Sequence, residues 1–249
     1  MIKKIIFTFI IVLAFSIQPA VAQRKVCKSA DIAFERKQYN TAIERYKKAL
    51  KKTNKKKRED DKEYITYQLA ECYRLTEATK LAESHYKRLL KTDYPKREPI
   101  IYYYYAEALK RNKKYEDAAI QYAKYNELVP DDTRGIKALE DIQNIQQWLE
   151  APTRYEVTRV KKLNTRSSEL GVAWISNNYN EIIFASTRED GVSKEKDAIT
   201  GQHFSDFYVS RQNKQGEWED VVLADEEGIN SEGSEGMPFI NKSFSTMYF

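Results

Sequence analysis

Few residues in this chain are of a type and spacing that could carry catalysis. The two histidines, His85 and His203, do not stand in a local motif for a serine or cysteine nucleophile. The glycine-rich stretch at 228–236 lacks the Lys-Ser/Thr ending of a phosphate-binding loop. The acidic residues 225–227 before it lack the alternating order of a calcium loop. We therefore expect no enzyme activity, no cofactor and no bound metal.

The cysteines are Cys27 and Cys72, which are too few for a disulfide framework. The sequence has no CxxC pair of the kind that binds zinc. Single thiols are the plainer expectation, and one bridge in an oxidising compartment is the alternative.

The most basic stretch, residues 51–58, holds six lysines or arginines among eight residues. Such a run can bind nucleic acid or anionic lipid. No aromatic side chain interrupts it for stacking on bases. We therefore expect a charged, solvated loop between two repeats, with a surface for acidic partners as the alternative, and no nucleic-acid partner.

Residues 1–22 have the three parts of a secretory signal. Lysines precede an apolar run at 5–17, and Ala20-Val21-Ala22 is a small-residue cleavage site. The run is shorter than the roughly 20 residues of a membrane-spanning helix, and an uncleaved anchor or a lipoprotein are the alternatives. We expect an exported chain that begins at Gln23. It would lie in the periplasm or on the periplasmic side of the outer membrane, associated with a membrane only indirectly.

The chain changes character near residue 151. Residues 1–150 contain 31 basic and 21 acidic residues, whereas residues 151–249 contain 11 and 16. Seven of the eight glycines follow residue 151, and alanine and tyrosine are concentrated before it. Pro152 would end the last helix. We expect an α+β multidomain chain, with an N-terminal all-α region at 23–150 and an all-β region at 151–249.

Three segments of the helical region share one pattern, in which a small residue is followed four places later by tyrosine. The small residues are separated by 40 and 36 residues. This spacing resembles the tetratricopeptide repeat, a pair of helices with a period of about 34 residues. The tryptophan and glycine of that repeat are missing, so a generic array of helical hairpins is the alternative. The small positions are Ala30, Ala70 and Ala106 in the first helices and Ala42, Ala82 and Ala118 in the second, with Tyr46, Tyr86 and Tyr122 beside them.

Residues 133–150 carry an apolar stripe at helical spacing and are expected to form a helix that caps the last repeat. Asp131-Asp132-Thr133 is a signal for the start of this helix. The stripe consists of Ile136, Leu139, Ile142, Ile145 and Leu149.

An array of three units would curve and leave a concave face on its first helices. Tyrosine mixed with charge on that face could hold an extended peptide or a partner helix. The alternative is that the tyrosines pack between helices and the charges are solvated. The residues expected on this face are Tyr64, Tyr67, Glu71, Arg74, Tyr103, Glu107, Lys110 and Arg111.

Short segments of the second region have the composition and alternation of β-strands. A hairpin turn is expected at 212–216. The strands are expected within 180–188, 206–210, 217–223, 234–240 and 246–249.

Several of these stretches resemble exported Bacteroidetes proteins that join tetratricopeptide repeats, a Tol-B-like or WD-like β-propeller and a C-terminal OmpA-like domain. The stretches are 163–169, 181–188, 228–236 and 246–249. The resemblance implies that residues 151–249 are the first blades of a propeller, which needs at least four. We therefore expect a fragment of a longer protein. Peptidoglycan binding would belong to a later domain and is not assigned to these residues.

These patterns lead to one functional expectation and one alternative. We expect a non-enzymatic protein–protein interaction scaffold of the bacterial envelope, with envelope proteins bound by the repeat array. The resemblance further implies an anchor role in a secretion or gliding apparatus of the type IX kind. The alternative is a propeller-based enzyme or carbohydrate-binding protein whose site lies in further blades.

Overall fold

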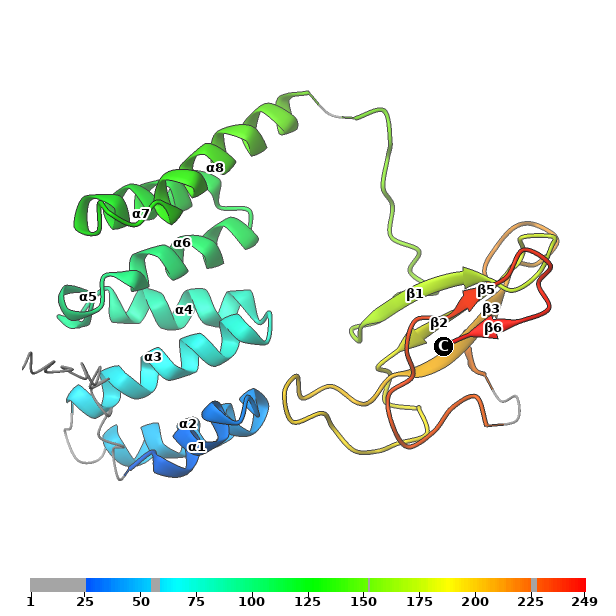
Figure 1. Ribbon diagram of the computed structural model, residues 1–249, viewed down its shortest axis with the longest axis horizontal. Coiled ribbons are helices and arrows are strands. Elements are labelled where there is room, and N and C mark those ends of the chain that lie inside the picture. The colour runs from blue at the N-terminus through cyan, green and yellow to red at the C-terminus, as the bar shows by residue number, and fades with distance from the viewer. Residues whose placement is uncertain (1–25, 55–58, 152, 225–227) are drawn as a thin grey trace, which may run out of the picture.

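The computed structural model describes residues 26–54, 59–151, 153–224 and 228–249 (Figure 1). The predicted signal peptide lies outside these residues, as do the second half of the basic run and the acidic residues 225–227. The chain forms a stack of helices and a separate set of antiparallel strands, joined by a linker (Figure 1). No described helix is long and apolar enough to cross a membrane.

The described residues up to 150 form eight helices in a stack of hairpins. Helices α1 and α2, α3 and α4, and α6 and α7 pair with each other, successive pairs pack together, and α8 packs on α7. The prediction of helical hairpins is therefore confirmed. The helices are α1 (Lys28–Glu35), α2 (Tyr39–Asn54), α3 (Glu59–Leu75), α4 (Thr79–Leu89), α5 (Tyr94–Arg97), α6 (Ile100–Arg111), α7 (Tyr115–Leu128) and α8 (Arg134–Glu150).

Alanine sets how closely the two helices of a pair approach. The six alanines predicted at the small positions are at most 1% exposed, and the three tyrosines predicted beside them are fully buried. Larger apolar side chains of α3 and α6, such as Leu69 and Ile101, complete the same core. A larger residue at an alanine position would force the paired helices apart, because the core has no free space for it.

The turn inside each hairpin contains one residue in the left-handed backbone region. Lys37, Glu77 and Lys113 have φ of 60°, 59° and 62°. They are exposed, and they repeat at the same intervals as the alanines. Glycine is the usual residue at such a helix end, since a Cβ atom is strained in this conformation. Each hairpin therefore holds one strained turn residue at an equivalent place.

Helix α8 buries fewer residues of its apolar stripe than predicted. Of the five predicted residues only Ile142 is buried, whereas Ile136 and Leu149 are 48% and 62% exposed. The close contact is made by a small residue, because a Cβ atom at Gly135 would overlap the side chain of Asn126 on α7. The predicted cap therefore covers α7 with its first half and leaves much of the stripe exposed.

Two helix ends also differ from prediction. Thr133 makes no side-chain bond at the start of α8, and Asp132 instead accepts the N–H of Arg134 at 3.0 Å. The expected loop after the first hairpin begins late, because α2 continues through Lys51 to Asn54. The first half of the basic run is therefore helical.

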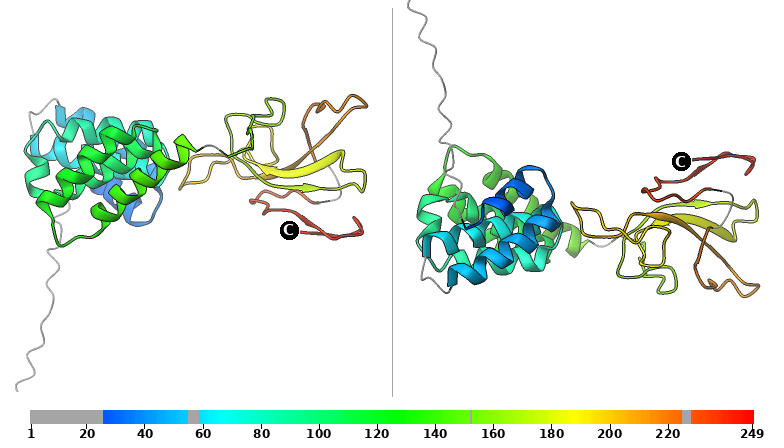
Figure 2. Two further views of the ribbon diagram at one scale, coloured as in Figure 1. Left: turned by 90° about the horizontal axis from the view of Figure 1, so that it is seen from above. Right: turned by 90° about the horizontal axis from the view of Figure 1, so that it is seen from below.

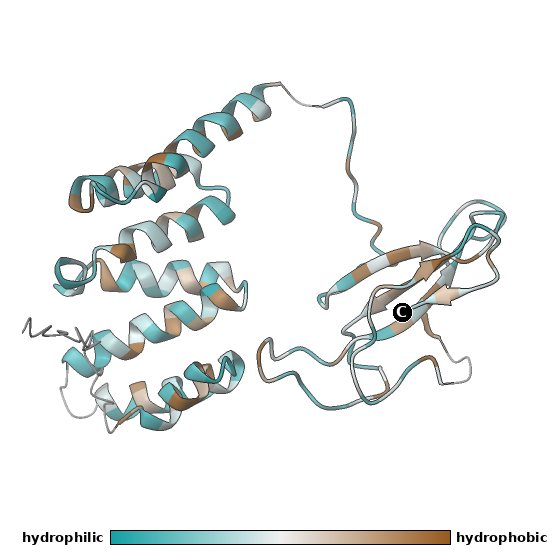
Figure 3. Ribbon diagram, viewed as in Figure 1, coloured by the Kyte–Doolittle hydropathy of each residue, from teal (hydrophilic) through white to brown (hydrophobic). Residues whose placement is uncertain are grey.

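The strand region contains a four-stranded antiparallel sheet in the order β1-β2-β3-β4 and a separate pair, β5 and β6. Strand β2 pairs with β3 along its whole length and is buried on both faces of the sheet. Apolar residues concentrate in the strands, whereas the loops between them are mainly hydrophilic (Figure 3). The strands are β1 (Glu169–Trp174), β2 (Glu181–Ser186), β3 (Asp206–Arg211), β4 (Val222–Leu223), β5 (Phe239–Ile240) and β6 (Met247–Tyr248).

Strand β1 was not predicted, and four of the five predicted strands are shorter than the ranges expected for them. The pairing of β1 with β2 shifts register between Leu170 and Ala173. Gly171 has φ of +60° and lies against Met237, where a Cβ atom would overlap. Burial nevertheless alternates without a break along β1, with the apolar Leu170, Val172 and Trp174 on its more exposed side. The other three residues, Glu169, Gly171 and Ala173, are of types that strands disfavour, so the sequence does not mark this strand.

Two loops of the strand region, 66 residues apart, have the same hydrogen bonds. Thr165 donates its N–H and its hydroxyl to Oε1 of Glu169, at 3.1 and 2.6 Å. Ser231 donates the same two groups to Oε1 of Glu235, at 3.0 and 2.7 Å. In the first loop the N–H of Ser167 donates to the hydroxyl of Thr165, and in the second the N–H of Gly233 donates to the hydroxyl of Ser231, both at 3.0 Å.

The turns that follow these loops repeat as well. Tyr179 donates its N–H to the carbonyl of Ser176 at 3.1 Å, and Phe244 donates to the carbonyl of Asn241 at 3.0 Å. Tyr179 and Phe244 both have positive φ, at 51° and 54°. Their rings meet edge to face at 5.8 Å. Strands β5 and β6 therefore begin a second copy of the unit that β1 and β2 begin.

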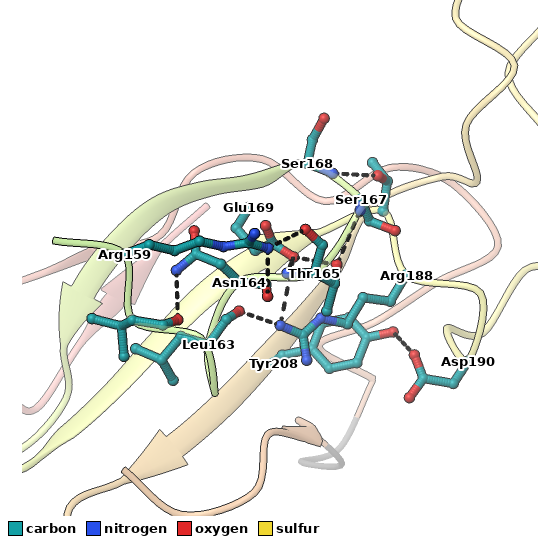
Figure 4. A network of polar contacts seen from close by, with 12 residues as sticks. Arg159, Leu163, Asn164, Thr165, Ser167, Ser168, Glu169, Arg188, Asp190 and Tyr208 are labelled. Carbon is teal, nitrogen blue, oxygen red and sulfur yellow. Dashed lines mark hydrogen bonds and ion pairs between the residues drawn. The ribbon is translucent and has the colours of Figure 1, made fainter. Parts of the chain in front are cut away.

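Arg188 joins the end of the linker to the sheet (Figure 4). Its side chain is 11% exposed and lies over the rings of Phe184 and Tyr208, at 5.4 and 5.3 Å. The guanidinium donates to the carbonyl of Leu163 and lies 3.6 Å from Glu169. A planar guanidinium can stack and donate at the same time, so one side chain fixes the linker on β2 and β3.

Replacing Lys113 with glycine is expected to stabilise the protein by about 0.5–1 kcal/mol. The strain of a Cβ atom at positive φ is relieved, and this gain exceeds the entropy that glycine adds to the unfolded chain. Urea denaturation measures the change. The matched control, Lys48→Gly in the exposed middle of α2, should lose about 1 kcal/mol. A loss of stability in both variants would contradict the assignment of strain to the turn.

Replacing Arg188 with lysine is expected to destabilise the strand region by about 2 kcal/mol, because lysine neither stacks on the two rings nor donates as a planar fork. The control is Arg211→Lys, whose side chain is 60% exposed beside Glu181 and should change stability by less than about 0.5 kcal/mol. Thermal unfolding followed by near-ultraviolet circular dichroism measures both. Equal effects would show that Arg188 does not hold the linker.

Candidate functional site: the face of the first helices

Each hairpin contains a carboxylate on its first helix that accepts a hydrogen bond from a buried tyrosine hydroxyl on its second. The tyrosine stands fifteen residues after the acid in all three units. Burial raises the pKa of each tyrosine far above its ordinary value, and the neighbouring carboxylate raises it further. The hydroxyls therefore remain donors. The pairs are Asp31 with Tyr46, Glu71 with Tyr86, and Glu107 with Tyr122.

The carboxylates of the second and third hairpins also hold a cation three residues further along the helix. Arg74 donates Nε and Nη2 to Glu71, at 3.2 and 2.6 Å. Lys110 donates Nζ to Glu107 at 2.8 Å. Glu71 is only 7% exposed, so its charge is buried and compensated. These two carboxylates connect the core of each hairpin with the charged groups on the face of the first helices.

The first hairpin lacks this cation because Phe34 occupies the equivalent position. Asp31 instead accepts the hydroxyl of Tyr64 at 3.2 Å and the thiol of Cys27 at 3.5 Å. Tyr64, which was predicted on the binding face, therefore ties α3 to α1 through its hydroxyl.

The thiol and imidazole groups of the array make packing contacts. Cys27 and Cys72 are both buried, and burial, with a smaller effect of Glu71, raises the pKa of Cys72 to about 12. His85 is half-buried against Tyr73, and burial lowers its pKa. Within the described residues no group of three or more His, Cys, Asp or Glu side chains could hold a metal ion.

A pocket of about 380 Å³ opens between α3, α6 and the start of α8. It lies on the side of the stack formed by the first helices, as the sequence predicted for the binding face. Four predicted residues line it, namely Arg74, Tyr103, Glu107 and Arg111. Four further lining residues were not predicted, namely Leu75, Glu77, Tyr104 and Arg134.

Two arginines of this pocket lie over two neighbouring tyrosine rings. The guanidinium of Arg74 is 4.3 Å from the ring centre of Tyr104, and that of Arg134 is 5.2 Å from Tyr103. The two rings are 5.6 Å apart and meet at 69°. Cation–π contact and the carboxylates behind them fix both guanidinium groups in place. The hydrogen bonds from Arg134 hold the pKa of Asp132 well below its usual range.

The arginines keep donors that can bind a ligand. Arg74 donates Nε and Nη2 to Glu71, and Arg134 donates the same two nitrogens to Asp132. No acceptor within the described residues meets Nη1 of either arginine. Arg111, which pairs through Nη1 with Glu77, adds a third guanidinium. Fixed guanidinium donors of this kind bind carboxylates in preference to neutral groups.

Three other residues predicted on the face belong to the framework of the array. Tyr67 packs at 5.6 Å from the ring of Tyr94, and burial raises its pKa. Glu71 has its carboxylate engaged by its two partners, and Lys110 is held by Glu107. The missed signal was an acidic residue directly after the first alanine of each unit, fifteen places before a tyrosine. That the face binds a partner stays a prediction.

The stacked hairpins and the pocket define a helical-repeat protein that carries a strand region. Among solved structures, the chain is similar to the C-terminal tetratricopeptide-repeat-containing domain of an FK506-binding protein from Plasmodium falciparum. The identity is 22%, the match covers 51% of this chain and 89% of that one, and the TM-score is 0.45. No family model and no curated protein matches the chain.

Replacing Tyr86 with phenylalanine is expected to destabilise the protein by about 1–2 kcal/mol, because Glu71 loses a buried donor. The control is Tyr102→Phe on α6, whose half-buried hydroxyl has no hydrogen-bond partner within the described residues, and it should be nearly neutral. Urea denaturation of both variants measures the difference. Indistinguishable midpoints would show that the carboxylate–tyrosine bond does not stabilise the hairpin.

Proposed function

We propose that this chain is a non-enzymatic scaffold that binds other proteins, and that its helical array is of the tetratricopeptide type. The observation that carries the proposal is the pocket beside α3, α6 and α8, with its guanidinium groups held over tyrosine rings. Groups that are fixed before a partner arrives lose little conformational entropy on binding. A preorganised polar and aromatic surface on the first helices suits recognition of a protein segment.

The partner segment is extended and carries acidic side chains. Arg74, Arg111 and Arg134 supply donors from three different helices, so an extended chain crossing them can meet more than one. Tyr103 and Tyr104 offer ring surface to the apolar parts of the same segment. Glu107 is paired with Lys110, and Glu77 is paired with Arg111 itself, so the groups that face a ligand are the guanidinium nitrogens that these carboxylates do not engage, above all Nη1 of Arg74 and Arg134.

The cellular setting of this proposal rests on the sequence. A signal at residues 1–22 would export the chain, and the partners would then be envelope proteins in the periplasm or beside the outer membrane. The anchor role in a type IX secretion or gliding apparatus rests on the resemblance to Bacteroidetes proteins of this arrangement. Peptidoglycan binding is not proposed for these residues.

The strand region is proposed to begin a β-propeller. Strands β1 to β4 form one antiparallel sheet in sequential order, as in a four-stranded blade. A second copy of this unit begins with the loop of Ser231 and Glu235, and continues with the turn at Phe244 and the antiparallel pair β5 and β6. A repeating blade is the simplest arrangement that produces both observations.

Saccharide binding by the strand region is a second candidate function. A pocket of about 450 Å³ there is lined by the aromatic residues Trp174, Tyr179 and Phe244 and by the polar residues Asn241 and Lys242. The ring of Tyr179 lies 6.0 Å from Trp174 and 5.8 Å from Phe244. An aromatic pocket with a few polar groups can stack a sugar ring and bind its hydroxyls.

Capture of envelope proteins by residues 23–249 tests the scaffold. A captured protein should bind about tenfold more weakly to the double variant Arg111→Gln/Arg134→Gln, because two charge-assisted hydrogen bonds are lost. The control is Lys124→Gln/Lys137→Gln, which removes the same charge from exposed positions outside the pocket. Surface plasmon resonance with the purified partner measures the affinity of the original chain and of both double variants.

The scaffold proposal fails if no protein is captured, or if both double variants bind like the original chain. Binding of a soluble chito-oligosaccharide, seen as quenching of tryptophan fluorescence, together with no captured protein, would favour the second candidate. Circular dichroism confirms that each variant is folded.

A further inference from the structure

The long loop between β2 and β3 has a tip with a fixed shape at residues 197–202. Oδ1 of Asp197 accepts the N–H groups of Ile199 and Thr200, at 3.0 and 2.7 Å. Gly201 donates its N–H to the carbonyl of Asp197, and Asp197 donates to the carbonyl of Gln202, both at 2.8 Å. These bonds close the tip on itself and leave the carbonyl groups at its end directed outward.

The tip is also tied to the sheet from which it projects. Oε1 of Gln202 accepts the hydroxyl of Thr187 at 2.6 Å and that of Ser168 at 2.9 Å. An isolated bridge between Lys196 and His203 pairs the two arms below the tip. The tip therefore moves with the strand region and not independently of it.

The tip meets the start of α2 in the first helical hairpin. Asn40 donates its N–H to the carbonyl groups of Ala198 and Ile199, at 3.1 and 3.2 Å. Gly201, at φ of +74°, lies so close that a Cβ atom would be 2.5 Å from Cγ of Asn40. The loop reaches the first hairpin in Figure 1, and the views of Figure 2 agree.

This contact is made by one hairpin of the three. The first N–H groups of a helix lack a partner in their own helix and need an acceptor from elsewhere. The residues equivalent to Asn40 at the start of α4 and α7 are Lys80 and Glu116. Within the described residues, neither N–H has an acceptor. The loop therefore supplies α2 with carbonyl acceptors for an N–H of its first turn, and the equivalent N–H groups of α4 and α7 have no such acceptors within the described residues.

We propose that residues 197–202 are an intramolecular docking element that binds the start of α2 and holds the strand region against the first hairpin. The linker after α8 joins the two regions at the other end of the stack (Figure 1). With the tip docked, the strand region is attached to the array at two places, the linker after α8 and the start of α2. These two attachments set the orientation of the strands relative to the array. This inference goes beyond the proposed function and does not depend on any partner.

Hydrogen exchange measured by NMR tests the docking. In the original chain, the Asn40 amide should exchange at least tenfold more slowly than the amides of Lys80 and Glu116. Gly201→Ala should remove this protection, because the added Cβ atom overlaps Asn40. The matched control is Gly216→Ala, which has a similar φ of +79° and nothing within 4 Å of the added atom. It should leave the protection unchanged.

A second variant approaches the contact from the other side, so that damage to the loop itself cannot explain the result. Asn40→Pro removes the donated N–H at a first-turn position of α2 that tolerates proline, so it should release the tip and increase the radius of gyration in small-angle X-ray scattering. Lys80→Pro, at the equivalent place in α4, should not. Equal exchange at Asn40, Lys80 and Glu116 in the original chain would overturn the proposal. So would a loss of protection in Gly216→Ala, or an unchanged radius of gyration in Asn40→Pro.

Discussion

A hydrogen bond from a buried tyrosine to a carboxylate on the facing helix is the constraint on which the array depends. A carboxylate in a helical core is costly unless it is hydrogen-bonded, and here it stands next to the alanine that lets the helices approach. The tyrosine therefore satisfies the acid and fills the space beside the alanine. In two hairpins the same acid also holds a cation, so the packing of the core fixes the positions of these charges on the face of the first helices.

In the strand region, too, a single acidic side chain organises each of two loops. One acidic side chain, Glu169, organises its loop through Thr165 and also faces the guanidinium of Arg188. Glu235 organises the second loop with the same pair of bonds. Tyr179 and Phe244 keep strained turns of equal shape in contact with each other. Repetition in this region thus lies in polar loops and turns more than in the strands themselves.

Sequence reasoning found the features that depend on side-chain size and spacing. The buried alanines and tyrosines, the hairpins and the antiparallel strands at β2 and β3 were all predictable, because burial imposes a period on apolar residues. Glu71 and Glu107 were placed on the face of the first helices, but their bond to a buried tyrosine was missed, because a buried carboxylate looks like a surface charge in a sequence. Arg134 was missed because its place beside Tyr103 depends on how α8 crosses α7. Strand β1 was missed because half of its residues, Glu169, Gly171 and Ala173, are of types that strands disfavour.

The distance along the chain from acid to tyrosine is fifteen residues in every hairpin, whereas the distance from one hairpin to the next is 40 residues in one case and 36 in the other. Each unit therefore tolerates a change of length between hairpins and none within one. Neighbouring hairpins are nevertheless bound to each other, since Asp31 also accepts the hydroxyl of Tyr64 and Arg74 stacks on Tyr104 of the next hairpin. Differences in length between related arrays are therefore expected in the loops that join hairpins and not in the turns inside them.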